Sequence, residues 1–135
     1  ISETENRVVY LDFAHAPSKV LATTQSFKEW FGAKKLIAVF ELHTFSSLNK
    51  DFMHQYKGAL NAADEAIVFF NEHTLQMKNM PPLEFSFIHE QFDHPNFSVI
   101  TDEKDLYKKL GEEKYEFYNI LLMTSGNFNK MSFHF

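Results

Sequence analysis

The sequence has 135 residues, of which 44% are apolar and 23% are charged, and its net charge is −5. These values are typical of one globular domain with its own core, and they exclude a disordered chain. Because cysteine is absent, disulfides, cysteine-ligated metals and thiol catalysis are excluded. The lone arginine, Arg7, argues against a nucleic-acid partner, and no apolar run approaches the roughly 20 residues of a membrane span.

The first third of the chain predicts one strand and one helix. Residues 1–6 are polar and predict a frayed tail, whereas residues 7–13 are β-branched and aromatic and predict a strand. Pro17 suits the first turn of a helix, and Gly32 suits its end. Apolar spacing predicts a buried helix face formed by Val20, Thr24, Phe27 and Phe31, widened by Leu21 and Trp30.

Strands and helices continue to alternate along the rest of the sequence. Continuous apolar runs at 35–40, 66–70 and 119–123 predict strands buried on both faces, and 98–100 predicts a shorter strand. Residues 83–92 and 102–110 predict helices, the second ended by Gly111. Residues 41–49 and 71–82 predict loops, the second stopped by Pro81 and Pro82. A further amphipathic helix is predicted from the spacing of Phe52, Tyr56, Ala59, Leu60 and Ala63.

This alternation predicts the fold class. We expect an α/β, three-layer Rossmann-like domain with a mostly parallel sheet of about five or six strands and helices on both faces. In such sheets, ligands bind beyond the carboxyl ends of the strands, so the segments that follow the strands form the candidate site. The candidate residues in these segments are Asp12 and His15, then His43, Thr44 and Ser46, then His73, and finally Ser125, Gly126 and Asn127.

Each candidate also has a purely structural interpretation. Asp12 can cap N–H groups of the turn that follows it, and His15 can be a structural histidine. Gly126 can serve only to permit a turn. The residues that can simply cap the next helix are Ser46, Ser47 and Asn49. The histidines with no predicted partner are His54, His89, His94 and His134, so no metal site is expected.

The chain lacks the motifs of a self-contained nucleotide site, since neither GxGxxG nor GxxxxGK[ST] occurs, and it lacks GxSxG. Four segments nevertheless resemble, in order, the C-terminal domain of the Mur ligases and of folylpolyglutamate synthase. DFAHAP at 12–17 resembles the opening D-[YF]-A-H-x-P motif, and ELHTFS at 41–46 resembles Q/E-P-H-R-x-S. AADEAIV at 62–68 and LLMTSGNF at 121–128 resemble the third and last strands, and the tail through NKM at 129–131 is most similar to the murein peptide ligases.

The resemblance implies that residues 1–135 are the third domain of a cytoplasmic ligase whose UDP-sugar and ATPase domains lie outside this chain. It implies an acyl phosphate formed with ATP and Mg²⁺, both bound mainly by the central domain, and an incoming amine that attacks it. The implied substrates are UDP-N-acetylmuramate and the murein tripeptide L-alanyl-γ-D-glutamyl-meso-diaminopimelate, and the fragment alone is expected to be inactive. The implied nucleotide contacts are Asp12 and His15, and the implied substrate contacts are His43, Thr44, Ser46, Ser125, Gly126 and Asn127.

Three departures from the family pattern concern charge and turn geometry. Leu42 replaces the usual proline, while Thr44 and Ser47 stand where many members have arginine. A peptide with several carboxylates needs cations, so we expect Lys50, Lys130 or another domain to supply them. Two alternatives stay open: a ligase of this family that adds a single amino acid or glutamate, and a non-catalytic α/β binding module.

Overall fold

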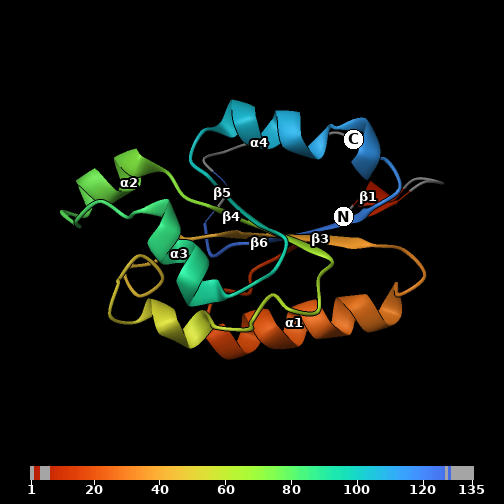
Figure 1. Cartoon of the computed structure of the whole chain (residues 1–135), viewed down its shortest axis with the longest axis horizontal. Coiled ribbons are helices and arrows are strands. Elements are labelled where there is room, and N and C mark those ends of the chain that lie inside the picture. Colours follow the sequence, from red (N-terminus) through yellow and green to blue (C-terminus); the bar gives the residue numbers. More distant parts are fainter. Residues whose placement is uncertain (1, 4–6, 127, 129–135) are drawn as a thin grey trace.

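A six-stranded sheet forms the centre of the computed structural model, which describes residues 2–3, 7–126 and 128 (Figure 1). The strand order is β1-β2-β6-β3-β4-β5. β1 pairs antiparallel with β2, and every other pairing is parallel, as the sequence predicts. The strands are β1 (Ser2–Glu3), β2 (Val8–Asp12), β3 (Leu36–Glu41), β4 (Glu65–Phe69), β5 (Phe97–Ile100) and β6 (Asn119–Met123).

Helices cover both faces of this sheet, which confirms the three-layer prediction (Figure 1). α1 (Pro17–Trp30) and α3 (Phe85–Phe92) pack on one face, and α4 (Glu103–Leu110) packs on the other. α2 (Glu72–Met77) follows β4, and two short 3₁₀ segments are η1 (Met53–Tyr56) and η2 (Glu113–Tyr115).

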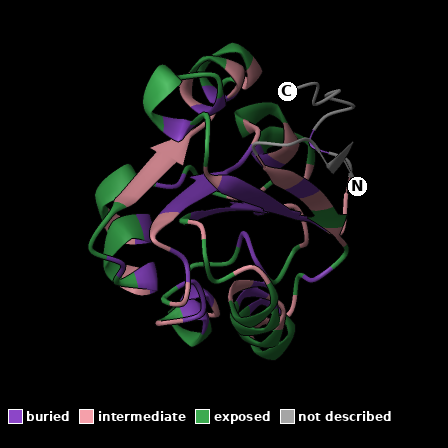
Figure 2. Cartoon of the chain, turned by 90° about the vertical axis from the view of Figure 1, so that its right-hand side faces the viewer, coloured by how far each residue is buried: buried purple, intermediate pink, exposed green. Residues whose placement is uncertain are grey.

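Side chains of the central strands alternate between two buried clusters. In β3, Leu36, Ala38 and Phe40 join the cluster under α1, whereas Ile37 and Val39 join the cluster under α4. Because successive residues of a strand point to opposite faces, a strand covered on both sides needs apolar residues throughout. The buried strands at the centre of Figure 2 therefore correspond to the continuous apolar runs of the sequence.

α1 buries a narrower stripe than the sequence predicts. Val20, Thr24 and Phe27 are buried, but Leu21 is 38% exposed and Trp30 is 76% exposed. At roughly 100° per residue, these two side chains lie about 90° to either side of the buried line, where the sheet does not reach them. The expectation that they widen the buried face is wrong.

The predicted helix through residues 52–63 is also wrong. Only the short η1 segment forms there, followed by turns, and Gly58 has a φ of +78°. That left-handed conformation interrupts a right-handed helix and suits glycine. Tyr56 and Leu60 are nevertheless buried. Their spacing therefore predicted correctly which side chains are buried, although the helix itself does not form.

Three smaller differences involve segments that were expected to be irregular. Residues 71–82 contain α2, which Asn71 caps by accepting a 2.8 Å hydrogen bond from the His73 N–H. Ser2–Glu3 forms β1 and not a frayed tail, because β2 provides a pairing edge. Glu41 is the last residue of β3 and is buried, so it does not belong to a polar loop.

Asp64 connects α1 to the amino edge of the sheet. Its Oδ2 accepts hydrogen bonds from Lys28 Nζ at 2.7 Å and from the Leu36 N–H at 2.8 Å. Partial burial raises the pKa of Asp64, but the hydrogen bonds from Lys28 and Leu36 together lower the pKa below its usual value. The folded state therefore favours the ionised carboxylate.

This arrangement predicts a pH-dependent stability difference. A lowered pKa adds stability that is present above the unfolded pKa of about 4 and is lost as pH falls through the folded pKa. We expect Asp64→Asn to be less stable than the native chain at pH 6, with the difference shrinking toward pH 3 in urea titrations. Asp51→Asn, at an exposed position, is the control variant, and an Asp64→Asn difference that stays constant across the range would contradict the prediction.

Candidate functional site

The segments that follow β2, β3 and β6 begin at the same level of the sheet. Asp12 of β2 and Phe40 of β3 both pair with Met123 of β6, so the three strands end together. The Thr124 N–H then donates to the Asp12 carbonyl oxygen at 3.0 Å. We call this carboxyl edge of β2, β6 and β3, with the segments 12–15, 41–47 and 124–126, the rim.

Asp12 has both a structural partner and an available oxygen. Its Oδ2 accepts a hydrogen bond from the Ala14 N–H at 2.9 Å, which is the local capping contact that its type and position allow. Among the described residues, no group donates to Oδ1. A carboxylate oxygen in this state can accept a hydrogen bond from a ligand hydroxyl.

His15 presents its ring to solvent while its backbone is anchored. The ring Nδ1 lies 3.0 Å from the Phe13 carbonyl oxygen, and since a carbonyl only accepts, this nitrogen is the donor. Nε2 of the neutral ring is then the acceptor. The Tyr56 hydroxyl donates to the His15 carbonyl oxygen at 2.5 Å, and burial raises the pKa of Tyr56 to about 12, so the donor keeps its proton.

His43 and Gly126 bring the β3 and β6 segments into contact. A Cβ placed on Gly126 would lie 2.9 Å from the His43 ring carbons Cγ and Cδ2, closer than side chains approach. The Gly126 N–H donates to Thr124 Oγ1 at 2.7 Å, which turns the β6 segment toward His43. Glycine is required here because the imidazole packs directly against its backbone.

Glu41 organises the β6 segment from inside the protein and was not predicted as a site residue. It is 3% exposed, and its Oε1 accepts from Thr124 Oγ1 at 2.5 Å and from the Phe128 N–H at 3.0 Å. Phe128 has a φ of +50°, so this bond holds a residue in an uncommon conformation. The available signal was a carboxylate directly after five apolar residues of a buried strand.

Thr44 and Ser47, at the two positions where arginine was expected from the family pattern, form a local turn. Thr44 Oγ1 accepts from the Ser47 N–H at 3.0 Å, and the Ser47 hydroxyl donates to the Thr44 carbonyl oxygen at 3.2 Å. Ser46 between them is exposed. Of the lysines proposed as substitutes, Lys50 lies 5.9 Å from the centre of the Phe87 ring, and Lys130 lies outside the described residues.

The structure therefore places most predicted site residues along the rim. Asp12, His43 and Gly126 are joined through the contacts around Thr124, and Ser125 lies between Thr124 and Gly126. His73 lies in α2 beyond β4, and Asn127 falls outside the described residues. His94 is a structural histidine, since it is buried between the Asn96 N–H and the Ala63 carbonyl.

Comparison with known proteins assigns this arrangement to a family. A family model described as "Mur ligase, glutamate ligase domain" matches residues 1–126. The chain belongs to this Mur ligase family. The UDP-N-acetylmuramate–L-alanine ligase of Protochlamydia amoebophila is 38% identical over 66 residues, which cover 49% of this chain and 14% of that protein. The ligase of the same name from Chlorobium chlorochromatii is 42% identical over 57 residues, or 42% of this chain and 12% of that protein.

Two solved structures share the Mur ligase fold described here. A murein peptide ligase from Psychrobacter arcticus 273-4 superposes with a TM-score of 0.72 at 18% identity, covering 96% of this chain and 27% of that chain. A domain from Haemophilus ducreyi 35000HP, described as part of a UDP-N-acetylmuramate:L-alanyl-γ-D-glutamyl-meso-diaminopimelate ligase, gives 0.65 at 21% identity and covers 93% and 85%. The chain thus spans only a small part of its full-length Mur ligase relatives.

Mur ligases depend on ATP and Mg²⁺, but the described residues do not fit the metal. No group of three or more His, Asp or Glu side chains comes together among them. At the rim, the Gly126 N–H is already bonded to Thr124, so the segment offers no glycine-rich phosphate cradle. Asp12 is suited to contact the ribose of a nucleotide, because its Oδ1 can accept a hydrogen bond from a ribose hydroxyl.

No helix within the described ranges is long and apolar enough to cross a bilayer.

Proposed function

We propose that this chain is the C-terminal domain of an ATP-dependent amide ligase that joins UDP-N-acetylmuramate to the murein tripeptide L-alanyl-γ-D-glutamyl-meso-diaminopimelate. The observation that carries the proposal is the family match over residues 1–126 together with the convergence of the β2, β3 and β6 segments at one rim. A carboxyl edge of this kind is where α/β domains bind ligands. The rest of the ligase supplies the UDP-sugar site and the phosphate loop.

In this proposal the domain contributes positioning. ATP transfers its γ-phosphoryl group to the muramate carboxylate, the amine attacks the resulting acyl phosphate, and phosphate and a proton leave. Asp12 Oδ1 accepts a hydrogen bond from a ribose hydroxyl, and the exposed His15 lies beside the nucleotide. His43, Thr44 and Ser46 face the phosphates or the amine substrate, and Ser125 and Gly126 line the pocket of the amine substrate. Holding both reactants in place lowers the entropic barrier.

L-Alanine is the second candidate for the amine substrate. The curated relatives at 38% and 42% identity are named as L-alanine ligases. The Thr44–Ser47 turn is satisfied internally and places no cation in the β3 segment, which fits an amine substrate with a single carboxylate. A ligase acting on UDP-N-acetylmuramate is common to both candidates.

Turnover by the full-length enzyme separates the two substrates. We expect phosphate release with UDP-N-acetylmuramate, ATP, Mg²⁺ and the tripeptide, and much slower release with L-alanine or D-glutamate. Turnover of L-alanine alone supports the second candidate, and turnover with none of the amines rejects both. In calorimetry, the isolated 135-residue chain should bind ATP more weakly than about 1 mM, since it lacks the phosphate loop.

A further inference from the structure

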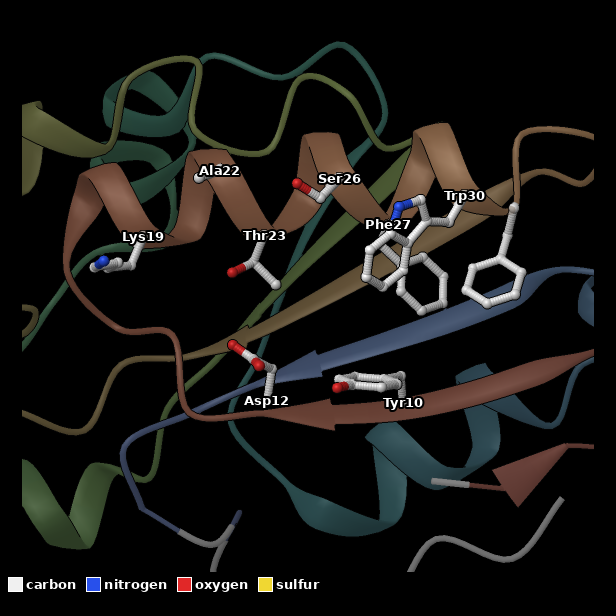
Figure 3. Close-up of a pocket in the computed structure, with 9 residues that line it drawn as sticks. Tyr10, Asp12, Lys19, Ala22, Thr23, Ser26, Phe27 and Trp30 are labelled. Carbon is white, nitrogen blue, oxygen red and sulfur yellow. The ribbon is translucent and has the colours of Figure 1, made fainter.

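The nucleotide contact proposed for Asp12 lies at one end of the rim. Figure 3 shows the Asp12 side chain directed from β2 toward α1, into a cavity of about 370 Å³ that Lys19 and Thr23 also line. From β2, the strand order continues through β6 and β3 to β4. A nucleotide at Asp12 therefore leaves the side of β3 and β4 for the amine substrate.

The β3 segment of the rim has no cation of its own for a substrate carboxylate. Residues 41–47 include no lysine or arginine, and Thr44 and Ser47 bond to each other in a closed turn. Phe45 lies within this turn and is 62% exposed. Since carboxylates are bound most strongly by charged donors, a carboxylate-bearing substrate at this segment needs a cation from a neighbouring element.

Lys78, at the end of α2, brings a cation to this segment. Its Nζ lies 4.1 Å from the centre of the Phe45 ring, the shortest lysine-to-ring distance among the described residues. Within residues 2–3, 7–126 and 128, this ammonium group has no ion pair and no hydrogen bond. The ring therefore holds the ammonium group beside the β3 segment while its N–H donors stay available to a ligand.

β4 and α2 extend the rim beyond β3. Glu41 of β3 pairs with Phe69 of β4, and the Leu42 N–H donates to the Phe69 carbonyl oxygen at 2.8 Å, so the two strands end at the same level. α2 follows β4. The end of α2 lies next to the β3 segment, since Lys78 contacts Phe45.

Backbone hydrogen bonds close the end of α2 and fix the position of Lys78. The Asn79 N–H donates to the Gln76 carbonyl oxygen at 3.1 Å, and the Met80 N–H donates to the Leu75 carbonyl oxygen at 3.0 Å. Asn79 has a φ of +54°, the left-handed conformation that this helix-ending motif requires. Because these bonds involve only backbone atoms, replacing the Lys78 side chain should leave the turn intact.

We propose that Lys78 binds a carboxylate at the diaminopimelate end of the tripeptide, with the Phe45 ring positioning its ammonium group. The inference rests on the proposed function, in which the amine substrate contacts Ser125 and Gly126 after β6. β6 and β4 are separated by two strand spacings, or about 10 Å. An extended tripeptide spans about 10 Å, so its far end reaches Lys78 when its alanyl amine lies at the β6 segment. The carboxylate of free L-alanine adjoins its amine and does not reach Lys78.

Kinetics of the full-length ligase test this contact. Lys78→Met keeps an unbranched side chain without the charge, and we expect it to raise KM for the tripeptide roughly 10–100-fold, because a charge-assisted hydrogen bond is lost. KM for ATP should change less than about twofold, since the nucleotide contact is distant. Lys78→Arg should restore most of the tripeptide affinity. An unchanged KM for the tripeptide in Lys78→Met overturns the inference and leaves the proposed function standing.

Two other lysines separate this contact from a general effect of charge. Lys108 is exposed on α4, on the opposite face of the sheet, so Lys108→Met should leave KM for the tripeptide at its native value. Equal effects of Lys108→Met and Lys78→Met overturn the inference. Lys50 is the competing cation near α3, 5.9 Å from the centre of the Phe87 ring. A raised KM in Lys50→Met but not in Lys78→Met also overturns the inference.

Phe45→Leu tests the positioning by the ring. We expect KM for the tripeptide to rise only about two- to fivefold, with kcat and KM for ATP unchanged, because a cation–π contact at an exposed site is weak. Adding Phe45→Leu to Lys78→Met should raise KM no further, since the ring acts through the ammonium group. A further rise in the double variant would overturn the positioning role of Phe45.

A shorter substrate identifies the end of the peptide that Lys78 contacts. L-Alanyl-D-glutamate lacks the diaminopimelate residue, so Lys78→Met should raise its KM less than about twofold. An effect as large as that on the tripeptide places the contact at the glutamate and overturns the inference. A native enzyme that releases phosphate with L-alanine but not with the tripeptide rejects both the inference and the proposed tripeptide substrate.

Discussion

Replacing Glu41 by alanine is expected to lower the free energy of unfolding by about 2–5 kcal/mol, because two buried donors lose their acceptor. The Thr124 hydroxyl and the Phe128 N–H both donate to Glu41 Oε1, and all three residues are buried. Chemical denaturation monitored by circular dichroism measures this loss. In the full-length ligase, we expect kcat/KM for the amine substrate to fall roughly 10–100-fold, since the β6 segment shifts relative to His43.

Glu41→Gln is the matched control for this prediction. Its carboxamide oxygen can accept the same hydrogen bonds in nearly the same volume, so the cost should stay near about 1 kcal/mol. Rapid exchange of the Phe128 amide in the alanine variant, but not in the glutamine variant, would locate the defect. An alanine variant as stable as the native chain would show that the carboxylate does not hold the β6 segment.

The central strands could be predicted because burial on both faces leaves a clear sequence pattern. β3, β4 and β6 lie inside the sheet, and each is an unbroken apolar run apart from a polar residue at one end. The helix at 102–110 was predictable from local chemistry: Asp102 caps it by accepting from the Lys104 N–H at 2.7 Å, and Gly111 ends it. These signals depend on residues close in sequence.

Elements that depend on distant residues could not be predicted in the same way. Ser2–Glu3 forms a strand only because β2 offers an edge, and two polar residues carry no pattern of their own. Residues 52–63 show helical spacing, but Gly58 turns the chain back, and the Gly58 N–H bonds to the Phe92 carbonyl of α3 at 3.2 Å. Packing against α3 thus replaced the helix, although the same side chains remain buried.

For the candidate site, the sequence predicted where the residues lie on the sheet better than it predicted the side-chain contacts between them. The parallel topology required Asp12, His43 and Ser125 to follow strands that end at one edge, and the register of β2, β3 and β6 confirms this. The buried hydrogen bonds of Glu41 and the contact between His43 and Gly126 join segments more than 80 residues apart. A pattern of neighbouring residues in the sequence therefore could not predict them. The roles of the rim residues in binding stay predictions.

Asp12→Ala in the full-length ligase is expected to raise KM for ATP roughly 10–100-fold, and KM for the amine substrate much less. The physical reason is the loss of a hydrogen bond from a ribose hydroxyl to a charged acceptor, which contributes about 1.5–3 kcal/mol. Asp12 also accepts from the Ala14 N–H, so a stability loss of about 0.5–2 kcal/mol is expected as well. Steady-state kinetics with each substrate varied in turn measures the first effect, and urea titration measures the second.

Asp12→Asn distinguishes nucleotide contact from capping. Its side-chain oxygen can still accept from the Ala14 N–H, so the turn and the stability should be retained. The second oxygen becomes an NH₂ group that cannot accept from a ribose hydroxyl, so KM for ATP should remain raised. A residue that only caps the turn would give a different pattern. Asp12→Asn would then have the native KM for ATP, and Asp12→Ala would raise KM for ATP and KM for the amine substrate equally. That result would leave the rim without a nucleotide contact from β2 and would move the ATP site entirely to the rest of the ligase.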